Sequence, residues 1–135
     1  MFLRLVSTLT LSTGLLCACD CIELPAKEAE RSSEVVFRGT VVGFRDSDPG
    51  ERMVIFDVRR VWKGRVRRQF EMPAVQGDWC GAFKPSLLKI GNDLVVYASR
   101  IARGTEYLPM PCNTTLARST ESAQALGRGR KPNSK

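Results

Sequence analysis

The sequence predicts a mainly β protein, a five-stranded antiparallel barrel with one helix before the strands and one after them. Two observations predict this fold class. Between residues 34 and 110, short segments rich in β-branched and aromatic residues alternate with turn-forming residues. Helix-forming composition with start or stop signals occurs at residues 25–31 and 116–126, which flank the strands.

The N-terminal segment has the layout of a secretory signal peptide. A short charged start, residues 1–4, precedes the apolar and uncharged residues 5–16. About a dozen apolar residues are too few to span a bilayer as a helix. Signal removal requires a small residue before the cut, so we expect cleavage after Ala18, with Cys19 as the first mature residue. Cleavage after Gly14 is a competing alternative.

The cysteine count favours the cut after Ala18. The chain has five cysteines, and the signal peptide takes one of them, so the mature chain keeps Cys19, Cys21, Cys80 and Cys112. Four thiols in an exported chain predict two disulfides, and spacing alone leaves all three connectivities open. A bond between Cys19 and Cys21 would be strained, because their side chains point to opposite sides. A metal site is the less favoured reading, since the chain has no His.

Length and charge bound the class of protein. Removal of residues 1–18 leaves 135 − 18 = 117 residues, enough for one compact domain. The formal charge of +7 becomes +6 when Arg4 leaves with the signal. Such a surplus attracts nucleic acid, anionic lipid or acidic proteins, although solubility is the simpler explanation.

The first half of the mature chain predicts a helix and a meander. Pro25 suits the first position of a helix, and residues 26–31 are good helix formers. Residues 34–44 form a strand whose two glycines allow a bend or bulge. Residues 46–50 make the clearest turn, and residues 53–62 return antiparallel. We expect the next three strands at residues 65–72, 94–98 and 106–110, the last at an edge because of its prolines.

The remaining segments are a connection, a helix and a tail. Residues 73–92 form a long connection that a disulfide would need to fasten. A second helix is predicted over residues 116–126, with Gly127 as its stop signal. The basic tail, residues 127–135, lacks apolar side chains that could pack, and its composition predicts disorder.

Two further function classes can be weighed from the residues. A basic hairpin contains Arg59, Arg60, Lys63, Arg65, Arg67 and Arg68. Binding of single-stranded nucleic acid needs stacking aromatics as well as charge, and we expect the nearby Trp62 and Phe70 to face the core. Nucleic acid is therefore not the expected ligand. Enzymatic activity is not expected either, because the chain has no His. The acids Asp46, Asp48 and Glu51 fit a solvated turn.

The order of these features resembles a known family. The chain runs Cys19-Asp20-Cys21, a helix, the strands VVFRGTVVGF and MVIFDVRRVW, Cys80-Gly81, LVVYA and Cys112. This order resembles the N-terminal, netrin-like domain of the tissue inhibitors of metalloproteinases, and bacterial exported proteins with a stand-alone version. The similarity covers residues 19–126. It implies a closed five-stranded OB-type barrel with packed helices, and disulfides Cys19–Cys80 and Cys21–Cys112.

The resemblance also implies an inhibitory mechanism. The amino group and carbonyl oxygen of Cys19 would bind the catalytic zinc of a target protease, and Asp20 would enter its specificity pocket. The target-binding residues would be Cys19, Asp20, Cys21, Ile22, Asp78 and Trp79. Asp20 is a departure from the family's pattern. Placing its carboxylate in a mostly apolar pocket would cost several kcal/mol. The usual animal targets are therefore not expected.

These observations predict an exported, disulfide-bonded OB-fold binding module, periplasmic or extracellular, that inhibits a zinc metalloendopeptidase. The alternative is an exported protein-interaction or polyanion-binding module without inhibitory activity. We expect a monomer with no cofactor, no metal of its own and no transmembrane segment after signal removal. Anchoring as a lipoprotein through Cys19 is a further alternative, which would block both the disulfide to Cys80 and zinc binding.

Overall fold

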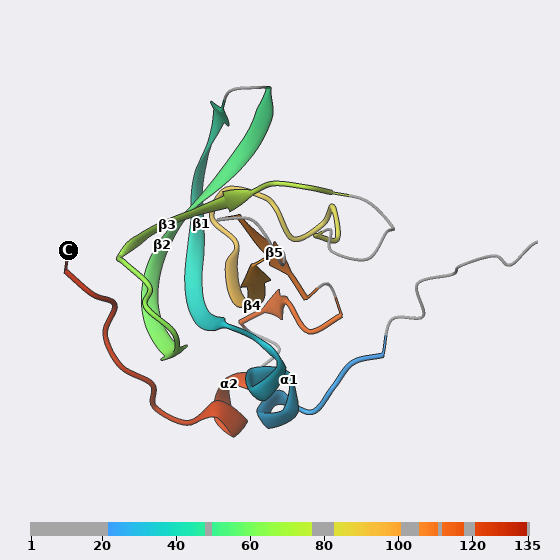
Figure 1. Cartoon of the computed structure of the whole chain (residues 1–135), viewed down its shortest axis with the longest axis vertical. Coiled ribbons are helices and arrows are strands. Elements are labelled where there is room, and N and C mark those ends of the chain that lie inside the picture. The colour runs from blue at the N-terminus through green and yellow to red at the C-terminus, as the bar shows by residue number, and fades with distance from the viewer. Residues whose placement is uncertain are drawn as a thin grey trace, which may run out of the picture.

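The computed structural model describes residues 22–47, 50–76, 83–100, 106–110, 112–117 and 121–134. Its elements, in chain order, are α1 (Ala26–Ser32), β1 (Val35–Ser47), β2 (Glu51–Lys63), β3 (Gln69–Pro73), β4 (Asp93–Arg100), β5 (Tyr107–Pro109), β6 (Thr115–Leu116) and α2 (Glu121–Leu126). The strands pair antiparallel in the order β3-β2-β1-β4-β5, and β6 pairs with β4 (Figure 1). The prediction of a mainly β, antiparallel fold is confirmed.

The long strand β1 organises the sheet. It pairs with β2 along its length and with β4 through residues 35–40. Its register with β2 shifts between Val36 and Phe37, between Arg38 and Gly39, and between Val41 and Gly43. Two of these irregularities lie next to Gly39 and Gly43, where the sequence predicts a bend or bulge. Each bulge adds local twist, which lets one strand serve both halves of a strongly curved sheet.

The concave face of the sheet holds the main core. Phe37 and Phe56 meet edge to face with their ring centroids 5.4 Å apart, and both are fully buried. Valines of β1 and β2, Met72 of β3, Phe83 and Leu94 belong to the same cluster. Phe70 packs against this cluster, as the sequence predicts. Alternate residues of each strand thus point inward, which is the pattern that the β-branched and aromatic positions predict.

A second, smaller core lies on the other face of β1 and β4. The two short helices lie next to each other there, beside the ends of the strands (Figure 1). Ala29 of α1 and Leu126 of α2 pack with Val36, Val95 and Tyr97. Side chains on both faces of β4 are therefore buried in this region, which explains why its apolar residues are consecutive.

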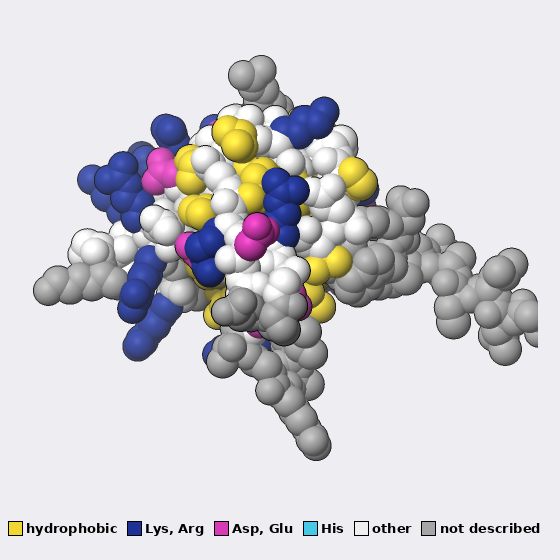
Figure 2. All heavy atoms as spheres, turned by 90° about the horizontal axis from the view of Figure 1, so that it is seen from above, with side chains coloured by type: hydrophobic (Ala, Val, Ile, Leu, Met, Phe, Trp, Pro, Cys, Tyr) yellow, Lys and Arg dark blue, Asp and Glu magenta, His cyan; other side chains and the backbone are white. Residues whose placement is uncertain are grey.

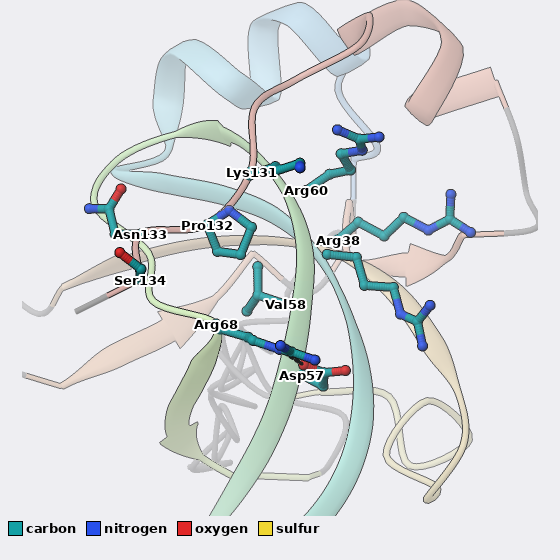
Figure 3. A pocket seen from close by; sticks show the side chains of 10 residues that line it. Arg38, Asp57, Val58, Arg60, Arg68, Lys131, Pro132, Asn133 and Ser134 are labelled. Carbon is teal, nitrogen blue, oxygen red and sulfur yellow. Dashed lines mark hydrogen bonds and ion pairs between the residues drawn. The ribbon is translucent and has the colours of Figure 1, made fainter.

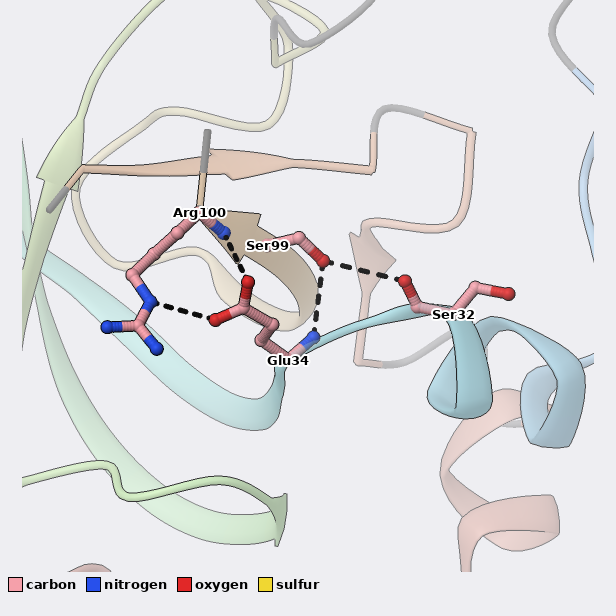
Figure 4. Close-up of polar contacts among 4 residues, drawn as sticks. All are labelled: Ser32, Glu34, Ser99 and Arg100. Carbon is pink, nitrogen blue, oxygen red and sulfur yellow. Dashed lines mark hydrogen bonds and ion pairs between the residues drawn. The ribbon is translucent and has the colours of Figure 1, made fainter. Parts of the chain in front are cut away.

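A polar network fixes α1 to the sheet (Figure 4). The Ser99 hydroxyl accepts a hydrogen bond from the Glu34 amide at 3.2 Å and donates to the Ser32 carbonyl at 3.5 Å. The Glu34 carboxylate accepts from the backbone amide of Arg100 at 3.3 Å and from its Nε at 2.8 Å. These contacts join the start of β1 to the end of β4.

The structure differs from the sequence prediction after Cys112. Residues 115–116 form the strand β6 instead of starting a helix, because Leu116 pairs with Leu94 and the β-branched Thr115 pairs with Val95. The helix α2 begins only at Glu121. The described strands are therefore six rather than five. The third predicted strand is also shorter, since β3 begins at Gln69.

The C-terminal tail, here residues 127–134, is the largest departure from the prediction. Its composition predicts disorder, yet it runs along the end of β2. Arg130 and Val61 exchange two backbone hydrogen bonds of 2.9 Å, and the Asn133 amide donates to the Val66 carbonyl at 2.9 Å. The reason is that β3 pairs only with residues 53–57 of β2, so the neighbouring edge has free backbone groups for the tail.

In the part of the chain that the structure describes, no helix is long and apolar enough to cross a membrane. The predicted signal peptide, residues 1–18, lies outside that part.

Candidate anion-binding groove

A groove lies between β2 and the C-terminal tail, and a β-bulge in β2 forms one side of it. Arg38 of β1 pairs with Arg60 of β2, and the next residue of β1, Gly39, pairs with Val58. Arg59 therefore has no partner on β1. A bulge breaks the alternation of side chains and re-aims the residues within it. Arg59 and Arg60 are consequently both exposed although they are consecutive, whereas Val58 and Val61 beside them are both buried.

Like charges face each other at this bulge. Arg38 and Arg60 lie directly opposite in an antiparallel pair, an arrangement that destabilises a sheet unless a counter-charge is near. Asp93 of β4 supplies one for Arg38, since its Oδ2 accepts hydrogen bonds from Nε at 2.9 Å and from Nη2 at 2.6 Å. These hydrogen bonds raise the pKa of Arg38 above its ordinary value, and partial burial opposes them. Arg38 is thereby held in its charged form.

The C-terminal tail forms the second wall of the groove. Lys131, Pro132, Asn133 and Ser134 face the bulge side of β2 (Figure 3). Pro132 and Lys131 of the tail line the groove together with Val58 and Arg60 of β2. The backbone bonds of Arg130 and Asn133 hold this wall in place.

The groove carries an excess of positive charge. Its volume is about 700 Å³, which falls within the roughly 300–1,000 Å³ typical of small-ligand sites. Its charged lining residues are the cations Arg38, Arg59, Arg60, Arg68 and Lys131, and the acid Asp57. Asp57 lies 3.3 Å from Arg68 Nε, so that pair is internally balanced. In the described residues Arg59, Arg60 and Lys131 have no acidic partner within ion-pair distance.

The surroundings of the groove are basic as well. Several Lys and Arg side chains project together on the left of Figure 2, with little acidic surface between them. Arg65 and Arg67 are exposed on the segment between β2 and β3. A positive field over a concave surface raises the local concentration of anions and speeds their association.

Among the described residues, no aromatic side chain lines the groove. Trp62, two residues after Arg60, packs against the second core, and its Nε1 donates to the Gly127 carbonyl at 2.9 Å. The described lining therefore offers no aromatic ring on which a nucleobase could stack. The groove can recognise charge and hydrogen-bonding oxygens, through guanidinium and ammonium groups together with Asn133 and Ser134.

The predicted basic hairpin divides into two parts. Arg59, Arg60 and Arg68 line the groove. Lys63 instead donates to the carbonyls of Glu30 at 2.8 Å and of Arg31 at 3.2 Å. Lys63 thus binds carbonyl groups at the C-terminus of α1, where a cation is favoured.

Most of the predicted target-binding residues lie outside the described residues: Cys19, Asp20, Cys21, Asp78 and Trp79, together with Cys80. Ile22 is described, and 71% of its surface is exposed. Leu24 is fixed to the segment after Cys112, because its amide donates to Asn113 Oδ1 at 3.1 Å and its carbonyl accepts from Asn113 Nδ2 at 2.7 Å. Cys112 itself is half-buried. The disulfide pairing stays a prediction.

Sequence reasoning missed Arg38 and all of the tail residues in the groove. Two signals were available. The consecutive arginines between Val58 and Val61 break the period of two, which indicates a bulge. The two glycines at 127 and 129 indicate close backbone approach, and Gly129 indeed has a positive φ of 67°. A Cβ there would lie 3.0 Å from Trp62 Nε1.

Comparison with known proteins finds no family model that matches this chain and no curated protein that matches its sequence. Among the described residues, no group of three or more His, Cys, Asp or Glu side chains could hold a metal ion.

Proposed function

We propose that this chain is an exported, non-enzymatic binding module that holds an anionic ligand in the groove between β2 and the C-terminal tail. The bulge at Arg59 carries the proposal. It presents two consecutive arginines next to Arg38, whose own charge is already opposed by Asp93. Repulsion among these cations would be relieved by a ligand that brings phosphate, sulfate or carboxylate groups, which arginine binds well in bidentate geometry.

The fold that we propose for the module is a closed OB-type barrel. Support comes from the strand order β3-β2-β1-β4-β5 and from Phe70 of β3 and Tyr107 of β5, whose ring centroids are 5.3 Å apart. Contact between the first and last strands of the order is what closure of the sheet requires. The N-terminal segment supports export, through its signal-peptide layout.

Titration with inorganic tripolyphosphate at low ionic strength tests the binding proposal. This probe carries several negative charges and has no base, sugar or apolar group. We expect binding by the mature chain and a loss of about tenfold or more on replacing Arg59 and Arg60 together with Ala, since each charge-assisted hydrogen bond contributes about 1.5–3 kcal/mol. Lys27→Ala with Arg31→Ala on α1 removes the same charge elsewhere and should weaken binding much less. Equal losses in both double variants would contradict a localised site.

Inhibition of a zinc metalloprotease is the second candidate, and the hydrogen bonds between Leu24 and Asn113 favour it. They anchor the chain two residues after the exposed Ile22, so that residues 19–21 would leave a rigid base. A preorganised N-terminus loses less entropy on binding. The Cys19 amine and carbonyl would bind the zinc of the target. The disulfides Cys19–Cys80 and Cys21–Cys112 that we propose would hold that wedge, and Cys112 is the neighbour of Asn113.

A further inference from the structure

The tail is attached to the sheet by a small number of polar contacts. The Arg130–Val61 pair and the Asn133–Val66 bond join backbone to backbone. The Arg130 guanidinium also donates to the Gly64 carbonyl and lies 3.2 Å from Asn133 Oδ1. Residues 127–131 are all exposed, as are Asn133 and Ser134, so burial of apolar surface contributes little.

A strand held by exposed hydrogen bonds opens more easily than a strand of the core, because few buried contacts must be broken. The tail brings its own positive charge, on Arg128, Arg130 and Lys131, to an edge that already carries Arg59 and Arg60. Repulsion therefore works against docking of the tail. An anion placed between Lys131 and the arginines would oppose that repulsion and favour the docked arrangement.

From these contacts we propose that the C-terminal tail is a ligand-binding wall that docks together with its ligand, with Lys131 as the residue of the tail that contacts the anion. The inference rests on the proposed function of the groove. Binding and docking are then linked, since an anion that binds only the docked form raises the fraction of docked tail. The apparent affinity for the anion is proportional to the fraction of docked tail, so a substitution that lowers this fraction weakens binding by the same factor.

Gly129 allows the inference to be tested without changing any charge. It has a positive φ of 67°, and a Cβ would lie 3.0 Å from Trp62 Nε1 and 3.1 Å from the Val61 carbonyl oxygen. Gly129→Val should therefore hinder docking of the tail while Lys131 and Arg130 are retained. Gly43→Val is the matched control, because a Cβ at Gly43 meets no atom within 4 Å and the residue is remote from the tail along the chain.

The experiment measures tripolyphosphate affinity together with hydrogen exchange of the Arg130 and Asn133 amides. In the intact chain we expect tripolyphosphate to slow the exchange of both amides. Gly129→Val should weaken binding by about fivefold or more, and Lys131→Ala by about threefold or more, whereas Gly43→Val should leave it unchanged. Arg59→Ala with Arg60→Ala should abolish the slowing of exchange.

Two results would overturn the inference in distinguishable ways. In the first, the intact chain binds tripolyphosphate, the Arg59 and Arg60 double variant does not, and Gly129→Val and Lys131→Ala bind as the intact chain does. That result would support the groove as the site but show that the tail does not take part in binding. Absence of tripolyphosphate binding by the intact chain would overturn the proposed function and the inference together.

Discussion

The aromatic rings of Phe70 on β3 and Tyr107 on β5 lie 5.3 Å apart, centroid to centroid, and join the two strands at opposite ends of the sheet order. Phe70 also contacts Phe37 of the main core at 5.0 Å. The chain of rings therefore runs from the centre of the sheet to its last strand. If this contact helps to close the sheet, the two rings must be energetically coupled.

We expect a double-mutant cycle of Phe70→Leu and Tyr107→Leu to give a coupling energy of about 0.5–1.5 kcal/mol in urea unfolding. Phe70→Leu paired with Phe44→Leu is the control cycle, because no contact joins those two rings. Additive effects of Phe70→Leu and Tyr107→Leu would show that the rings are neighbours without contributing to closure.

Gly64, directly after β2, allows the chain to turn toward β3. Gly64 has a positive φ of 83°, and a Cβ there would lie 2.6 Å from the Glu34 carbonyl oxygen. Gly64→Ala should destabilise the protein by about 2–4 kcal/mol, through left-handed backbone strain and the clash. Gly91 has a similar φ of 92° but open space around it, so Gly91→Ala should cost only about 1–2 kcal/mol. Equal costs, measured by chemical denaturation, would exclude a contribution from the clash.

The link between Glu34 and Arg100 predicts a dependence of stability on acid. The hydrogen bond from Arg100 lowers the pKa of Glu34 below its ordinary value. The folded pKa lies below the unfolded one, so the stabilisation is complete above about pH 5 and is lost as the pH falls through the folded value. Glu34→Gln should reduce the change in Tm between about pH 5 and pH 2. The same substitution at the exposed Glu23, which makes no ion pair among the described residues, is the control. Parallel Tm curves for Glu34→Gln and the unchanged protein would contradict the link.

The N-terminal arrangement predicts a disulfide pattern. Leu24 lies three residues after Cys21 in the sequence and is hydrogen-bonded to Asn113, the neighbour of Cys112, so we expect Cys21 to pair with Cys112. Non-reducing peptide mapping of the exported protein should find Cys21–Cys112 and Cys19–Cys80 with no free thiol. If a metalloprotease is inhibited, one residue added before Cys19 should abolish inhibition, since it moves the amine by about 3.5 Å. A Cys19–Cys112 bond, or equal inhibition by the extended form, would contradict this arrangement.

The sequence was sufficient to predict most of the sheet. Residues 34–44, 53–62 and 94–98 show the composition of strands, and the structure has β1, β2 and β4 there. The strand β6 was not predictable in the same way, because two residues carry no period and their pairing depends on β4. The helix α2 starts at Glu121 instead of the predicted Leu116 for the same reason. The pairing of Leu116 with β4 outweighs the local preference for helix.

The groove was predicted only in part, for a different physical reason. The basic residues of β2 are visible in the sequence, but their common direction depends on a one-residue bulge opposite Arg38. The tail has little apolar surface, so composition predicts that it does not pack. It is held instead by hydrogen bonds, mainly those of the Arg130 and Asn133 backbone groups, which composition does not reveal.

The most direct test of the anion-binding account is to map the amide chemical shifts of the mature protein during a titration with tripolyphosphate. We predict the largest changes at residues 57–60 and at Lys131, Asn133 and Ser134, because these two segments line the groove. Residues 26–32 of α1, which also carry Lys27 and Arg31, should change little at the same concentrations. Changes spread evenly over all basic segments, or centred on α1, would contradict a ligand site in the groove.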